Sequence, residues 1–160
     1  MEVPGRAVLI TGGKRIGAAI AIDLAARGAD IALAYHRSSE EAAATVETAR
    51  ASGRTAVAIR ADLADPAQCT RLVNEAAAQL GRLDVLVSMA SVYRSIPLER
   101  TDAAAWDSVL HVDLRAAFLC AQAAIPHMRR GGAGGRIINF ADWIAVSGRP
   151  RYKGFLPYYV

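Results

Sequence analysis

Residues 8–17 are the stretch of this chain best suited to bind a phosphate. They read VLITGGKRIG, an apolar run followed by glycines and then by Lys14 and Arg15, which lead into an alanine-rich segment. A strand, a glycine turn and a helix N-terminus point backbone N–H groups outward, and the helix dipole favours an anion there. Glycine also lets the backbone approach a phosphate closely. The pattern predicts a phosphate site; the alternative is a glycine turn without a ligand.

The elements around this turn are predicted to form a parallel sheet. Short apolar runs alternate with longer alanine-rich segments, which is typical of strands alternating with helices through right-handed crossovers. The strands are expected at residues 6–11, 30–35, 55–60, 84–88 and 136–140. The helices are expected at residues 14–27, 39–52, 65–81 and 101–129. The fold class is therefore α/β, a doubly wound Rossmann-type sheet of five βα units in one domain.

Local signals mark the ends of these helices. Ser39 is expected as the N-cap of the second helix, and Asp102 as an N-cap of the fourth. Pro66 suits the first position of the third helix, and Gly28 is placed to end the first. Pro126 lies inside the fourth helix and is expected to kink or end it, because proline has no N–H to donate.

The composition limits the classes of partner. Apolar residues make up 53% of the chain and charged residues 21%, and the net charge is +4 with Lys and Arg scattered along the sequence. Without a basic block interleaved with aromatics, this charge favours phosphate-bearing small ligands over nucleic acid. No apolar stretch is expected to approach the ~18 residues of a membrane span, and the N-terminus lacks the apolar core of a signal peptide. A cytoplasmic protein is expected.

The two cysteines argue against a structural disulfide or metal site. Cys69 and Cys120 lie far apart in the sequence, each within a predicted helix. This usage fits a reducing compartment, and no ligand spacing predicts a metal site.

Residues that follow the strands are expected to share one edge of the sheet. In an open parallel sheet, ligands bind beyond the carboxyl ends of the strands, where the strand order reverses. The residues expected to gather at this edge are Gly12, Arg15, His36, Arg37, Asp62, Ala90 and Asp142.

In its motifs the chain resembles the short-chain dehydrogenase/reductase family. Five motifs occur in the family's order, TGGKRIG, ADL and SMAS after the first, third and fourth strands, HVDL in the long helix and NFAD after the fifth strand. The segments AYHRSSEEA, ADLAD and GRLDVLVSMASVY are similar to the pteridine reductase branch of that family. The glycine turn is one residue shorter than the branch pattern, so a tighter turn is expected.

The resemblance implies NADPH as cofactor. An NAD enzyme usually has an acid at the end of the second strand, whereas this chain offers Arg37 and Ser38, which suit a 2′-phosphate; the alternative is a solvated arginine and a capping serine. Asp62 resembles the residue that bonds the adenine amino group, and a turn role is its alternative. The residues expected to hold the nucleotide are Gly12, Lys14, Arg15, Ile16, Gly17, His36, Arg37, Ser38, Asp62, Leu63, Ala90 and Ser91.

The same resemblance implies the proton chemistry. In the family a Tyr, its pKa lowered by a Lys four residues on, donates a proton, and a Ser holds the substrate carbonyl. Here Asp142 stands at the Ser position, as in the pteridine reductase branch. The candidates for the acid are Tyr158 and Tyr159, of which Tyr158 is the expected one, with its Lys expected after Val160. Asp113 stands at the helix position of a proton-relay Asn, with a surface charge as the alternative.

Tyr93 is expected to stack on a flat substrate, or else to be half-buried packing. An ionised Asp142 accepts from N–H groups, which pterins carry. The expected function is NADPH-dependent reduction of a pterin-like heterocycle or a carbonyl. The alternatives are a 3-oxoacyl-carrier-protein-reductase-like enzyme and a non-catalytic nucleotide-binding member of the family.

The resemblance also bears on length and assembly. Family chains are longer, so this chain is expected to be the N-terminal part of a longer protein and, alone, to bind nucleotide weakly and turn over little. The family usually forms tetramers through its long helices, and residues 116–128 are apolar enough for that. A homo-oligomer is therefore expected.

Overall fold

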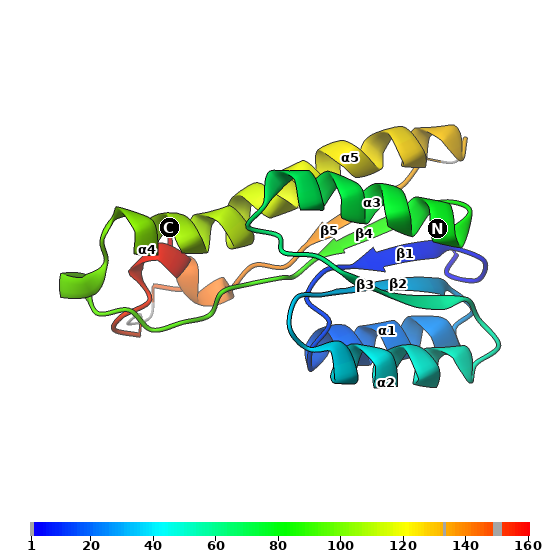
Figure 1. Cartoon of the computed structure of the whole chain (residues 1–160), viewed down its shortest axis with the longest axis horizontal. Helices are drawn as coiled ribbons and strands as arrows, with labels where there is room; N and C mark the ends of the chain where they lie inside the picture. Colours follow the sequence, from blue (N-terminus) through cyan, green and yellow to red (C-terminus); the bar gives the residue numbers. More distant parts are fainter. Residues whose placement is uncertain (1, 133, 149–151) are drawn as a thin grey trace.

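The computed structural model describes residues 2–132, 134–148 and 152–160, which form a three-layer α/β structure (Figure 1). Five parallel strands stand in the order β3-β2-β1-β4-β5. The strands are β1 (Ala7–Ile10), β2 (Asp30–Tyr35), β3 (Ala56–Arg60), β4 (Val85–Ser88) and β5 (Arg136–Asn139). The doubly wound sheet of the sequence analysis is confirmed. Its strand order reverses between β1 and β4, which opens a crevice at their carboxyl ends.

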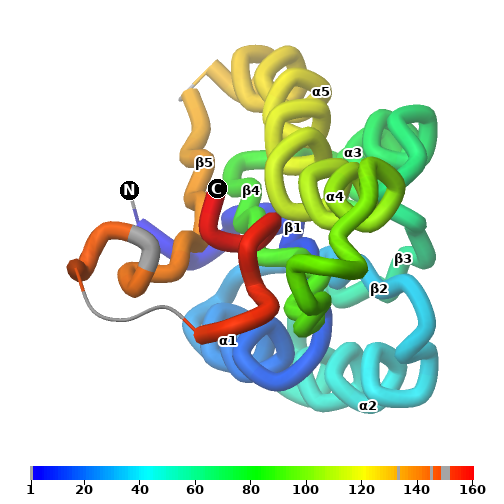
Figure 2. Tube along the Cα trace, turned by 90° about the vertical axis from the view of Figure 1, so that its left-hand side faces the viewer, coloured from blue at the N-terminus to red at the C-terminus, as the bar shows by residue number. Residues whose placement is uncertain are grey.

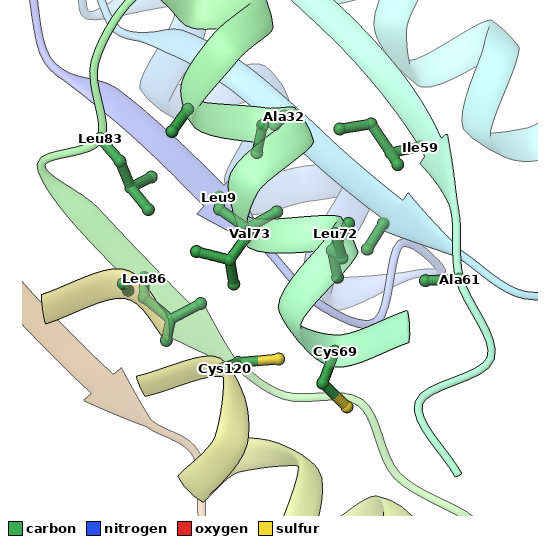
Figure 3. Close-up of a cluster of buried hydrophobic side chains, with 14 of the residues drawn as sticks. Leu9, Ala32, Ile59, Ala61, Cys69, Leu72, Val73, Leu83, Leu86 and Cys120 are labelled. Carbon is green, nitrogen blue, oxygen red and sulfur yellow. The ribbon is translucent and has the colours of Figure 1, made fainter. Parts of the chain in front are cut away.

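Helices cover both faces of this sheet. α1 (Ile16–Ala26) and α2 (Ser39–Arg50) pack on one face, and α3 (Pro66–Leu80) and α5 (Ala116–Arg130) on the other (Figure 1). Side chains alternate along β1. Val8 and Ile10 enter the core between the sheet and the α1/α2 layer, and Leu9 enters the core between the sheet and the α3/α5 layer. In the core under α3 and α5, Leu9 belongs to the same buried cluster as Leu72 of α3 (Figure 3). Burial on both faces explains why the central strands are continuous apolar runs.

The packing of α3 against α5 also brings the two cysteines together. Cys69 of α3 and Cys120 of α5 are both buried and free and belong to one core cluster (Figure 3), and the Cys69 thiol donates to the Leu63 carbonyl at 3.5 Å. Their separation in the sequence therefore hid a spatial pair. Among the described residues, no group of histidines, cysteines and acids could hold a metal ion.

Most helix ends follow the expected signals. Asp102 accepts a hydrogen bond from the Ala105 amide at 2.8 Å, Pro66 is the first residue of α3, and Gly28 has a φ of +91° just beyond α1. The prediction that Ser39 caps the second helix is wrong. The helix already begins at Ser39, because Ser38 occupies the N-cap position, and the Ser38 hydroxyl makes no capping bond.

The long helix differs from the sequence expectation near its middle. It consists of α4 (Ala103–Leu110), a π-helical turn (His111–Arg115) and α5, which continues through Pro126 to Arg130. Of the two expectations for Pro126, a kink or an end, the end is therefore wrong, while the predicted helix end near residue 129 agrees with the structure. α5 packs along α3, and this packing stabilises the helix on both sides of Pro126. The irregular turn lies before α5, at His111–Arg115.

This helix is also long and apolar enough to cross a membrane, although the sequence was expected to contain no such stretch. Residues Ala103–Arg130 include an 18-residue window of mean hydropathy 1.3, so length and composition alone would allow a membrane span. Asp113 and Arg115 interrupt the run without lowering that mean enough. A mostly buried core helix can have the same composition, but only 22% of this window is buried, in part through Ala116, Cys120 and Ala124 beside α3.

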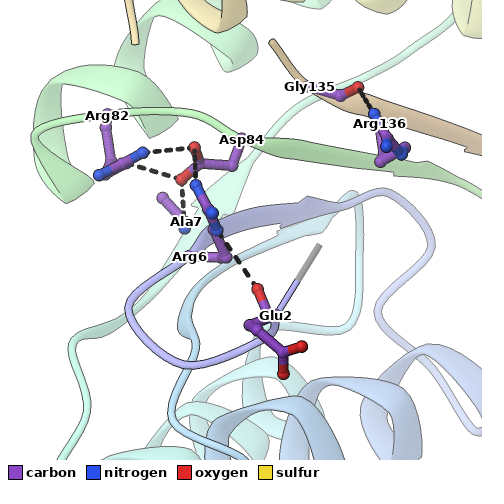
Figure 4. Close-up of polar contacts among 7 residues, drawn as sticks. All are labelled: Glu2, Arg6, Ala7, Arg82, Asp84, Gly135 and Arg136. Carbon is purple, nitrogen blue, oxygen red and sulfur yellow. Dashed lines mark hydrogen bonds and ion pairs between the residues drawn. The ribbon is translucent and has the colours of Figure 1, made fainter. Parts of the chain in front are cut away.

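A buried carboxylate joins β4 to β1 at the amino ends of these two strands. Asp84 accepts from the Ala7 amide at 3.0 Å and from two nitrogens of Arg82 at 2.7 and 2.6 Å, and Arg6 lies 3.4 Å away (Figure 4). Burial acts to raise the pKa of Asp84, but these partners together hold it below its usual value. The amino ends of the two central strands are thus fixed together.

Candidate functional site

A cavity of about 660 Å³ opens at the carboxyl ends of β1, β4 and β5. Figure 2 looks onto this edge, where the C-terminal segment lies in front of the central strands. Six of the expected site residues line the cavity: Leu63, Ala90, Ser91, Asp113, Asp142 and Tyr158. The crevice expected from the strand order therefore collects residues from five distant parts of the sequence.

The glycine turn leans directly on the β4 turn. A Cβ at Gly12 would lie 2.9 Å from the Met89 carbonyl oxygen, so only glycine fits without a shift. The Thr11 hydroxyl accepts from the amides of Met89 at 3.1 Å and Ala90 at 3.3 Å. This bonding fixes the small-residue turn after β4.

The shortened turn is tight, as the sequence analysis expected. A Cβ at Gly17 would overlap the Gly12 carbonyl oxygen, and Arg15 has φ +45° and ψ −101°. This conformation is nearly restricted to glycine, so Arg15 stores backbone strain at the start of α1. Lys14, Arg15 and Ile16 are all exposed on this turn.

The residues after β2 and β3 form the far end of the site. His36 Nε2 lies 3.7 Å from Asp62 Oδ2, and Arg37 is exposed. Asp62 Oδ1 also accepts from the Ala64 amide at 3.0 Å, so Asp62 has the turn role that was its alternative reading, with its other oxygen facing His36. Ser38 is the N-cap residue of α2, but its hydroxyl makes no capping hydrogen bond to that helix.

Asp113 ties the long helix to the β4 turn. Its carboxylate accepts from the Ser91 hydroxyl at 2.7 Å and from the Val92 amide at 2.7 Å. Burial raises the pKa of Asp113, although both bonds act to lower it. The surface-charge alternative is therefore wrong for this residue, which lies in the π-helical turn and lines the cavity.

Asp142 and Tyr158 form a hydrogen-bonded pair in the cavity wall. The Tyr158 hydroxyl donates to Asp142 Oδ2 at 3.3 Å, while Asp142 Oδ1 accepts from the Ile144 amide at 3.0 Å. Burial, followed by the charge of Asp142 and this hydrogen bond, raises the pKa of Tyr158 to about 12. The phenol is therefore protonated at neutral pH and stands ready as a donor.

Tyr93 lies beside this pair in an aromatic cluster. Its ring stacks on Phe155 with centroids 4.5 Å apart and meets Tyr158 edge-on at 5.0 Å. The Ile96 amide also donates to the Gly154 carbonyl at 2.6 Å. This bond joins the loop after β4, which carries Tyr93, to the C-terminal segment, which carries Phe155. Tyr93 contacts Tyr158 but does not line the cavity itself.

Ser88 and Phe155 were given no site role from the sequence, and of these two Ser88 lines the cavity whereas Phe155 does not. Ser88 ends β4, and its buried hydroxyl has no hydrogen-bond partner among the described residues. Such a hydroxyl facing a cavity suits a polar ligand atom. Phe155 was missed because nothing in the sequence linked it to Tyr93; the only available signal was the aromatic enrichment of the C-terminal segment.

The fold and this site define a Rossmann-type α/β protein with its site at the reversal of strand order. The model of the short chain dehydrogenase family matches residues 6–158, and the chain belongs to that family.

The chain is 37% identical over 155 residues to the hydroxynaphthalene reductase of Aspergillus fumigatus, covering 96% of this chain and 57% of that protein. It is 38% identical over 152 residues to the 3-oxoacyl-[acyl-carrier-protein] reductase of Staphylococcus aureus, covering 94% and 61%. A short chain dehydrogenase from Burkholderia cenocepacia in complex with NADP superposes with a TM-score of 0.91 at 39% identity, covering 99% and 63%. The chain thus spans about 60% of the length of these relatives. They support the family but add no support for the pteridine reductase branch.

Proposed function

We propose that this protein is an NADPH-dependent reductase of a carbonyl compound. The observation that carries the proposal is the Tyr158 hydroxyl, hydrogen-bonded to Asp142 in the wall of the cavity beside the glycine turn. A protonated phenol there can give its proton to a substrate oxygen. The similarity to two reductases and to a relative in complex with NADP supports this direction of reaction.

The residues present fit an NADPH molecule. Gly12 leaves room for close backbone approach, and the Ser88 hydroxyl, which has no partner in the part of the chain that the structure describes, faces the cavity. Arg37, Ser38 and Lys14 would hold the 2′-phosphate, since guanidinium, hydroxyl and ammonium groups all donate to phosphate oxygens. Bound NADPH supplies the hydride. The further contacts proposed for the nucleotide come from Arg15, Ile16, Gly17, His36, Asp62, Leu63, Ala90 and Ser91.

A pterin-like heterocycle is the second candidate substrate. Asp142 favours it, because a carboxylate accepts from ring and amino N–H groups, which a simple ketone lacks. Oδ1 and Oδ2 each have one described donor, so each keeps a lone pair for a substrate N–H. A non-catalytic nucleotide-binding role remains the alternative outside enzymes.

Cofactor binding tests the proposal first. Fluorescence titration of the purified chain should give tighter binding of NADPH than of NADH, and Arg37→Asp should reduce that preference roughly 10-fold or more by losing a charge-assisted contact. Arg27→Asp is the matched control, because Arg27 lies at the other end of α1 and pairs with Asp23. An unchanged preference in Arg37→Asp would overturn the cofactor assignment.

Turnover measurements then distinguish the three candidate functions, which are a carbonyl reductase, a reductase of a pterin-like heterocycle and a non-catalytic nucleotide-binding protein. NADPH oxidation is measured with a 3-oxoacyl thioester, a polycyclic aromatic ketone and a dihydropterin. Oxidation with either of the first two supports the carbonyl reductase, and oxidation with the dihydropterin alone supports the second candidate. Tight NADPH binding without oxidation by any of them, in the longer protein expected from the sequence as well as in this chain, supports the non-catalytic role.

We also propose a homo-oligomer that covers the long helix. Leu114, Phe118 and Ile125 are exposed by 66%, 62% and 38% on one helix, which is unusual for large apolar side chains. Light scattering after gel filtration should show Phe118→Glu shifting the protein toward a smaller species. Leu98→Glu, at a similarly exposed site (67%) outside this helix, is the control and should leave the mass unchanged.

A further inference from the structure

An ion pair spans the cofactor end of the molecule. Lys14 Nζ of the glycine turn lies 3.0 Å from Glu41 Oε1 in the first turn of α2. The side chains are exposed by 59% and 57%, so a ligand can reach both partners. Hydrogen bonding to Lys14 is the main cause that lowers the pKa of Glu41, which keeps this carboxylate charged at neutral pH.

This pair lies at the β2–α2 junction. The Gly13 amide donates to the Ala34 carbonyl of β2 at 3.2 Å, so the glycine turn rests against the end of that strand. Glu41 lies three residues after Ser38, the N-cap of α2. The Lys14 ammonium is therefore held beside the segment that supplies Arg37 and Ser38, the residues proposed above for the 2′-phosphate.

We propose that Glu41 is a specificity-determining residue of the nucleotide site, whose carboxylate competes with the 2′-phosphate of NADPH for the Lys14 ammonium. The inference rests on the proposed function, because only NADPH carries that phosphate. Glu41 contacts no reacting atom in this proposal. It sets the affinity for NADPH relative to NADH through Lys14.

The sign of the effect follows from charge. A phosphate monoester carries about −1.5 to −2 charges at neutral pH, so an adjacent carboxylate repels it and also occupies its cation. NADH has a neutral hydroxyl at the same place and does not sense Glu41 in this way. Removing the carboxylate charge should therefore favour NADPH selectively.

The other charges at this junction do not substitute for Glu41. Arg37 is cationic and attracts the phosphate, whereas Glu40 is the second acid in the first turn of α2. Both acids suit the helix N-terminus, and the described contacts join only Glu41 to Lys14. Glu40 is thus a matched control, with the same charge and helix turn but without the contact.

The test measures dissociation constants for NADPH and NADH with Glu41→Gln and Glu40→Gln. Glu41→Gln should tighten NADPH binding about 3- to 10-fold at low salt, as expected for one exposed charge pair, and leave NADH within error. Glu40→Gln should change NADPH binding less. The gain should disappear in a Lys14→Met background and shrink at 1 M salt, where the screening length is about 3 Å.

The outcomes separate this inference from the proposed function. If the wild-type chain prefers NADPH but Glu41→Gln behaves as Glu40→Gln or weakens NADPH binding, the role of Glu41 is overturned and the cofactor proposal stands. If the wild type shows no preference and Glu41→Gln gains one, the role of Glu41 is supported and the wild-type cofactor assignment fails. If neither protein prefers NADPH, both proposals fail.

Discussion

The hydroxyl of Tyr158 donates a hydrogen bond to Oδ2 of Asp142 across 3.3 Å, at the wall of the cavity where β4 and β5 end. The two residues are 16 positions apart, and the short helical turns Trp143–Ala145 and Leu156–Tyr158 present them to each other. The proposed acid is thus already paired with the residue proposed to orient the substrate. This pairing couples the protonation of Tyr158 to the charge of Asp142.

Replacing Asp142 by Asn should lower the pKa of Tyr158. The carboxylate charge and its hydrogen bond both favour the neutral phenol, so removing the charge makes the phenolate less costly. The pKa, now raised to about 12 chiefly by burial, should fall but remain above its usual value of about 10. Tyrosine titration with ring-labelled protein by NMR measures it. Asp107→Asn, an exposed carboxylate of α4, is the control, and an equal fall there would contradict the pairing.

Tyr93 gives a second prediction, because the structure offers it two roles. If Tyr93 holds Tyr158 through their edge-to-face contact, Tyr93→Leu should lower kcat up to about 10-fold and leave the affinity for NADPH unchanged, since one ring pair contributes about 0.5–1.5 kcal/mol. Tyr93→Phe should restore kcat. If Tyr93 instead stacks on a flat substrate, Tyr93→Ala raises KM for a pterin at constant kcat. The split between kcat and KM decides between the two roles.

Asp84 should dominate the acid sensitivity of the fold. Its carboxyl is buried against Arg82, Arg6 and the Ala7 amide, so Asp84→Ala should cost about 1–3 kcal/mol of unfolding free energy by leaving the buried Ala7 amide unpaired, while the two arginines stay partly in contact with water. Its folded-state pKa is lowered, so its contribution is present above the unfolded pKa near 4 and is lost as pH falls through the folded value.

Urea unfolding between pH 7 and pH 2.5 checks this prediction. The wild type should lose stability in the acid range, and Asp84→Asn should show a flatter profile. Glu75→Gln breaks the exposed pair with Arg71 and should cost less than about 1 kcal/mol. Parallel acid profiles for wild type and Asp84→Asn would show that other carboxyls govern the transition.

The sequence predicted the sheet well because its strands are local signals. The run before Thr11 and the run DIALAY are apolar enough to be buried on both faces, and the bounds of β2 agree with the prediction. Parallel order then placed Ala90 and Asp142 at one cavity, since all carboxyl ends meet at one edge, whereas Asp113 of the long helix was expected there only from the family resemblance.

Contacts between distant segments could not be predicted in this way. The pairing of Lys14 with Glu41 depends on how α1 lies beside α2, and the stack of Tyr93 on Phe155 depends on the path of the C-terminal segment. The capping prediction at Ser39 failed for a smaller reason. The sequence signal allowed either serine, and the helix begins one residue earlier than the signal suggested.

Arg15 supplies the last prediction, which separates stability from binding. Its φ of +45° with ψ of −101° costs of order 1–3 kcal/mol for a residue with a side chain and little for glycine. Arg15→Gly should therefore stabilise the fold by about 1 kcal/mol or more in urea unfolding, yet weaken NADPH binding by removing a cation from the proposed phosphate turn. Arg27→Gly, at a helix end with φ −87°, relieves no strain and should not stabilise the protein. A loss of stability in Arg15→Gly would mean that contacts of the Arg15 side chain outweigh the strain of its backbone.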